Sequence, residues 1–148
     1  MSYARKNAII TAAIWAVVLI GLLLSVLLPG PERFVEAEYA SWRLISAVLV
    51  LPGFLVNAWL GWRTKRGKER GEMDERDDVV ARHASQITLL AVGMIVFLAA
   101  LLLYDVYRDA GGVPAGWLWL LAYGTVAVLS LVHAVTGLLL DLRGVPDA

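Results

Sequence analysis

The strongest constraint on this chain is a set of four long apolar segments that carry almost no charge. A helix needs about 20 residues to cross the hydrocarbon core of a membrane, and each segment is that long. Strands of a membrane barrel would alternate polar and apolar side chains, and these segments do not. We therefore predict an all-α integral membrane four-helix bundle, a single domain over residues 1–148, with transmembrane helices at about 8–28, 42–62, 85–104 and 117–140.

Composition excludes several alternatives. Residues of the apolar class make up 59% of the chain, well above the roughly 45–50% of soluble domains. The chain has no cysteine, which excludes thiolate catalysis, disulfides and cysteine-ligated metal sites. The net charge is zero, so nothing in the overall charge favours a nucleic-acid partner.

The basic residues predict an orientation in the cell membrane, because Lys and Arg in short loops stay on the cytoplasmic side. Of the thirteen Lys and Arg residues, only Arg33, Arg43 and Arg108 fall on the side opposite the N-terminus. Trp59 and Trp62 lie at the end of the second span that leads into the loop 63–84, as expected for side chains that prefer the headgroup level. Both termini and the loop 63–84 are therefore expected in the cytoplasm.

The loop 63–84 changes character partway along. Asp74 is a suitable N-cap, and acids occupy the positions where the helix dipole favours them. The third helix should therefore begin near Glu75 and extend about two turns into the cytoplasm before its span. These acids together with His83 also suggest a metal site. However, the alternating ligands and the turn glycine of a calcium loop are missing, so we predict no metal and no cofactor.

The sequence Met73-Asp74-Glu75-Arg76-Asp77 precedes an apolar helix in a small chain with four spans. In this respect the chain resembles a family of small bacterial and archaeal multi-pass membrane proteins with an Asp-Glu-Arg motif before the third transmembrane helix. The resemblance covers the whole chain and implies its membrane architecture, but no activity. Asp74, Glu75 and Arg76 match the motif, and we take them as candidates for docking a protein partner.

Polar residues inside the spans suggest a second site, because they are costly in hydrocarbon. Counted from the cytoplasmic ends of their helices, Asn57, Gln86 and His133 lie in the same half of the predicted bundle. Together with Ser130 on the fourth span, they are the candidate pocket residues. One hypothesis is a small polar pocket reached from the cytoplasm, with His133 as its titrating member. The alternative is an interhelical polar clamp that binds no ligand. Replacing His133 by Leu would separate the two, because only a clamp would lose stability.

Small and polar residues at helical spacing predict which faces point inward. The stripes are Ser46, Gly53, Asn57 and Gly61 on the second span, Gln86, Gly93, Ala100 and Tyr104 on the third, and Ser130, either His133 or Ala134, Gly137 and Asp141 on the fourth.

Pro52-Gly53 in the second span indicates a kink, either static or part of a moving gate. An offset of 76 residues pairs Asn57 with His133, and one of 77 pairs Thr11 with Thr88, a faint sign of a parallel repeat.

No motif for hydrolysis, phosphate binding or metal-dependent catalysis is present, so we do not expect an enzyme. The favoured function is an accessory, regulatory or scaffold subunit that contacts a protein partner or membrane lipids through its cytoplasmic loop. The alternative is a transporter or channel subunit with a polar intramembrane pocket. That alternative requires a homodimer, because four helices rarely enclose a pathway, and it lacks the membrane-embedded carboxylate that small carriers usually need.

Overall fold

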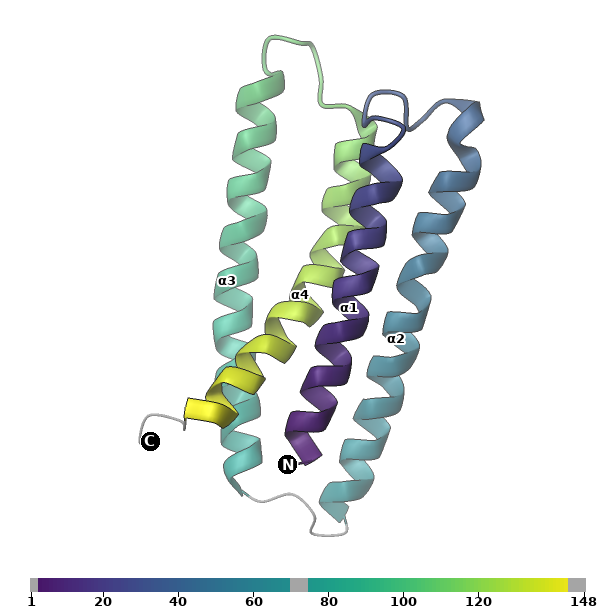
Figure 1. Ribbon diagram of the computed structural model, residues 1–148. Helices are drawn as coiled ribbons and strands as arrows, with labels where there is room; N and C mark the ends of the chain where they lie inside the picture. Colours follow the sequence, from purple (N-terminus) through teal and green to yellow (C-terminus); the bar gives the residue numbers. More distant parts are fainter. Residues whose placement is uncertain (1–2, 70–74, 144–148) are drawn as a thin grey trace.

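The computed structural model describes residues 3–69 and 75–143, and these parts of the chain form helices and connecting turns without strands (Figure 1). The elements are α1 (Tyr3–Leu27), the short 3-10 helix η1 (Ala37–Tyr39), α2 (Ala40–Glu69), α3 (Glu75–Tyr107) and α4 (Ala115–Arg143). All four α-helices contain a stretch long and apolar enough to cross a membrane. The all-helical prediction is therefore confirmed, and α3 is helical from its first described residue, Glu75.

The helices lie side by side in the order α2, α1, α4, α3 (Figure 1). The central pair, α1 and α4, is the most closely packed, and α2 and α3 flank it. Across the described residues, α2 and α3 are not packed against each other. We call the end where α1 and α3 begin the termini end, and the opposite one the loop end.

The core lies where α1 meets α2 and α4. Trp15 is completely buried and belongs to an apolar cluster with Val18, Leu22, Val50 and Ala127. The indole lies directly on Gly53, because a Cβ built on that glycine would stand 2.7 Å from the ring. α2 continues as a helix through Pro52. The glycine beside that proline thus provides close packing for Trp15.

Hydrogen bonds join the segments at the loop end. An Nη of Arg43 donates to the carbonyl oxygens of Phe34 and Glu36, at 2.6 and 2.9 Å. Trp119 Nε1 donates to Ser46 Oγ at 3.0 Å and so links α4 to α2. The connection after α1 and the first turn of α2 are therefore held to one another and to α4.

The predicted inward face of α3 is wrong. Gln86, Gly93, Ala100 and Tyr104 are all exposed on the outside of the helix assembly. The buried residues of α3 are instead Val80, Ala84, Thr88 and Val92. Since α3 packs mainly on one neighbour, α4, only a narrow stripe of the α3 surface is covered. The small residues used for the prediction lie on other faces of the helix and therefore do not mark the buried stripe.

Candidate functional site

A cavity of about 590 Å³ lies at the termini end, and all four helices line it. Its polar lining comes from α1 (Arg5, Asn7 and Thr11), α2 (Asn57), α3 (Ser85 and Thr88) and α4 (Ser130, His133 and Asp141). Since α2 and α3 both contribute walls without packing on each other, the cavity lies across the gap between these two helices.

Three of the four residues predicted to form a polar pocket line this cavity: Asn57, Ser130 and His133. Gln86 does not, because its side chain lies on the exposed side of α3. Ser85 and Thr88 occupy the cavity-facing positions of α3 instead. Successive helix residues are rotated by about 100°, so a neighbouring position points to a different face.

Asn57 joins three helices through hydrogen bonds. Trp15 Nε1 donates to Asn57 Oδ1 at 3.2 Å, and Asn57 Nδ2 donates to Ser130 Oγ at 3.4 Å. The amide thereby satisfies the buried indole of α1 and reaches the hydroxyl of α4. This relay is an interhelical polar clamp, and it forms the inner limit of the cavity where the core begins.

His133 lines the same cavity but is not a member of the clamp. Within residues 3–69 and 75–143, its ring makes no hydrogen bond to the protein, and the residue is exposed. Asn7 and Thr11 likewise present side chains that bond to no described group. Inside a membrane, such groups require water or a ligand as partner.

The hydroxyl groups contributed by α3 are already satisfied. Ser85 Oγ donates to the carbonyl oxygen of Ala81 at 2.9 Å, and Thr88 Oγ1 donates to that of Ala84 at 2.6 Å. These two residues therefore shape the cavity wall, and the side chains that are available to hydrogen-bond a molecule in the cavity come from α1 and α4. Charged side chains follow towards the chain ends, with Arg5 in the first turns of α1 and Asp141 about 12 Å along α4 from His133.

Residues paired by the faint repeat meet in this cavity. Asn57 and His133 both line it, and so do Thr11 and Thr88. The helix packing does not follow the same symmetry, because α1 packs closely on α4 whereas the equivalent pair, α2 and α3, is apart.

Sequence reasoning missed the contribution of α1. Asn7 and Thr11 were not among the predicted pocket residues, although they precede Trp15 at intervals of four. That spacing places all three on one helix face. The signal available in the sequence was that Asn7 and Thr11 lie on the same helix face as Trp15, which indicates that they too point towards the other helices.

The predicted docking residues fall largely outside the part that the structure describes. Asp74 belongs to residues 70–74, and Glu75 and Arg76 form the first turn of α3, whose side chains are not described. Among the described residues no group of His, Asp and Glu side chains could hold a metal ion.

A second cavity, of about 420 Å³, lies at the loop end between α1, α3 and α4. Its walls are almost entirely apolar, with Leu19, Val96, Leu103 and Leu120 among them. Its polar side chains bond within the protein: Trp117 Nε1 donates to Tyr107 Oη at 2.9 Å, and Thr125 donates to the carbonyl oxygen of Leu121.

No protein family, curated protein or solved structure matches the chain.

Proposed function

We propose that this chain is a non-catalytic multi-pass protein of the cell membrane that binds a small polar ligand in the cavity at the termini end. It would act as an accessory or regulatory subunit that reports the ligand to a partner. The observation that carries the proposal is the exposure of Asn7, Thr11 and His133 to one cavity without hydrogen bonds to the described protein. Groups of this kind, at membrane depth, favour a bound polar molecule.

Two observations support the membrane location. In the most apolar window of α3 only 11% of the residues are buried, and large apolar side chains cover its outside. Such a surface would be unfavourable in water and suits lipid. The distribution of Lys and Arg supports an arrangement with both termini, and therefore the cavity, on the cytoplasmic side.

A binding role is better supported than transport by one chain. Beyond the clamp, the cluster around Trp15 fills the space between α1, α2 and α4. The cavity therefore ends at a packed core, as a binding pocket does. The second candidate, a dimeric transporter or channel subunit, is favoured by the gap between α2 and α3, which a second copy could complete.

A catalytic role has little support. Among the described residues that line the cavity the only acid is Asp141, about 12 Å along α4 from His133. General acid–base pairs need groups within hydrogen-bond reach of the same reacting centre.

The test is native mass spectrometry of the full-length protein, purified from its own membranes in lipid nanodiscs. Gly137 lines the cavity, and a Cβ there would meet nothing within 4 Å, so Gly137→Leu is the variant chosen to occupy part of this space. Gly93→Leu is the matched control, because Gly93 also has open space but lies outside the cavity.

We expect a small molecule retained by the wild type and by Gly93→Leu, and lost in Gly137→Leu. Equal retention by both variants, or none by the wild type, would remove the ligand proposal. A partner protein that is lost on deletion of residues 69–78 would support the accessory role, whereas a ligand-bearing dimer would support transport.

A further inference from the structure

The polar cavity at the termini end is open along one side. Leu89 lines it and is nevertheless 69% exposed, and Gly61 and Ser85, which also line it, are exposed as well. These edge residues belong to α2 and α3, the two helices that are not packed against each other. Thr11 and His133 come from the closely packed pair between them, α1 and α4. The cavity is therefore a trough with polar groups along α1 and α4 and an opening between α2 and α3.

The side opening lies within the membrane-spanning stretches. Leu89 is about 15 Å along α3 from Val79, the first residue of the candidate span of that helix. At that depth the opening faces acyl chains and not water. A water-soluble molecule in the trough would place its polar surface against hydrocarbon, which is unfavourable. A ligand with an apolar segment in the opening avoids this cost.

Size and charge restrict the polar part of the ligand. The volume of about 590 Å³ lies within the range of about 300–1,000 Å³ that is typical of ligand sites. The charged residues that line the described cavity are Arg5 and Asp141, which are opposite in sign, and each already takes part in an interaction. The remaining polar lining groups are amides, hydroxyls and one imidazole. Such a set suits an uncharged head group that donates and accepts hydrogen bonds.

We propose that the ligand of this cavity is a single-chain membrane lipid with an uncharged, hydroxyl-bearing head group, of the monoacylglycerol type. The head group bonds to Asn7, Thr11 and His133, and the acyl chain leaves between α2 and α3 across Leu89. The lipid enters sideways from the bilayer through the opening. This inference rests on the proposed function, because it names the class of ligand that the same site binds.

The test is native mass spectrometry of the full-length protein in phosphatidylcholine nanodiscs, titrated separately with monooleoylglycerol, oleate and glycerol. We expect monooleoylglycerol to bind most tightly, and glycerol, which has the head group without the chain, to show no binding. Leu89→Gln should lower the association constant of monooleoylglycerol about five-fold, because an amide then replaces apolar contact with the chain.

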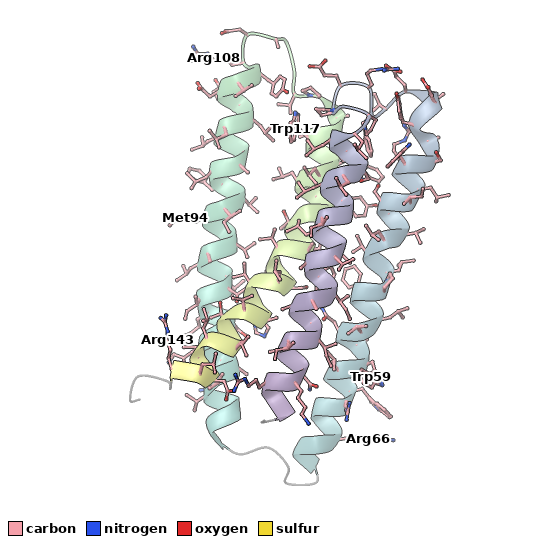
Figure 2. All side chains as sticks on the ribbon, viewed as in Figure 1. Trp59, Arg66, Met94, Arg108, Trp117 and Arg143 are labelled. Carbon is pink, nitrogen blue, oxygen red and sulfur yellow. The ribbon has the colours of Figure 1, made fainter. Side chains whose placement is uncertain are left out.

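Leu90→Gln is the matched control and should leave the association constant unchanged. Leu90 is 76% exposed and is next to Leu89, but it does not line the cavity. It shares a helix face with Met94, which Figure 2 shows on the side of α3 that faces away from the other helices. Circular dichroism verifies that both variants keep their helices.

Thr11→Val tests the polar end of the site. It removes one hydroxyl at nearly constant side-chain size and should lower the association constant of monooleoylglycerol about five-fold. Tighter binding of oleate than of monooleoylglycerol, equal effects of Leu89→Gln and Leu90→Gln, or an unchanged constant in Thr11→Val would overturn the inference.

Two further outcomes separate this inference from the proposed function. A water-soluble molecule that the wild type retains and Gly137→Leu loses, or binding of glycerol as tight as that of monooleoylglycerol, would overturn the lipid assignment and leave the binding function in place. A wild type that retains no molecule and binds none of the three probes would remove the proposed function, and the lipid assignment with it.

Discussion

The two cavities share three helices, α1, α3 and α4, yet their polar groups differ in one respect. At the loop end, Tyr107, Trp117 and Thr125 bond within the protein, so that cavity offers only hydrocarbon. At the termini end, His133 lines the cavity with no hydrogen bond to the described residues. The comparison teaches that polar groups in two cavities on the same helices differ in whether the protein itself satisfies them, and the proposed binding role depends on this difference and not on their presence alone.

The largest effect is expected at the boundary between the polar cavity and the core. Trp15→Ala removes a completely buried indole and leaves Asn57 without its donor. We expect it to lower the free energy of unfolding by about 3–5 kcal/mol, as for other large-to-small core changes. Unfolding in mixed micelles measures this. Trp62→Ala, at an exposed indole, is the control, and an equal loss there would contradict the assignment of the core.

Placing one amide in each cavity compares their polarity directly. Gly124 lines the apolar cavity and Gly137 the polar one, and a Cβ meets nothing closer than 3.9 Å at either position. Gly124→Asn should destabilise the fold by about 1–3 kcal/mol, because its amide finds no partner. Gly137→Asn should have an effect below about 1 kcal/mol. The change in helix propensity is the same at both sites, so equal losses would show that the cavities do not differ in polarity.

The clamp residue Asn57 and the cavity residue His133 should respond differently to apolar replacement. Asn57→Leu breaks the relay from Trp15 to Ser130 and should lower the unfolding free energy by about 1–2 kcal/mol. His133→Leu breaks no hydrogen bond to the described protein and should leave stability unchanged while abolishing ligand retention. Thermal unfolding together with native mass spectrometry measures both. A loss of stability in His133→Leu as large as in Asn57→Leu would assign His133 to the clamp.

The smallest effect is expected at the position that the sequence placed in the pocket and the structure does not. Gln86 is exposed on α3, so Gln86→Leu should change the unfolding free energy by less than about 0.5 kcal/mol and leave ligand retention intact. Parallel measurements on Ser130→Ala provide the comparison. Loss of the ligand in Gln86→Leu alone would mean that α3 turns its other face to the cavity when the site is occupied.

The residues of the candidate site could be predicted where their position depends on the sequence of one helix alone. Asn57 and Ser130 were identified because polar groups in hydrocarbon need partners, and the structure bonds them to each other. Gln86 obeys the same rule but lies near the end of its span, where a long side chain can reach the headgroups instead. The helix that carries Gln86, α3, has one main neighbour, so most side chains on this helix point away from the other helices.

Helix identity and length were readable from the chain, since apolar content and capping residues act locally and add up along each segment. The clearest case is α3, which was predicted to continue as a helix ahead of its apolar span and is helical throughout its described residues, Glu75–Tyr107. The order α2, α1, α4, α3 was not readable, because it depends on shape matches between residues far apart in the chain. The fit of Trp15 on Gly53, and the bond from Trp119 to Ser46, exist only once the helices have packed. That packing separates α2 from α3, leaves the polar cavity between them, and exposes His133 to it.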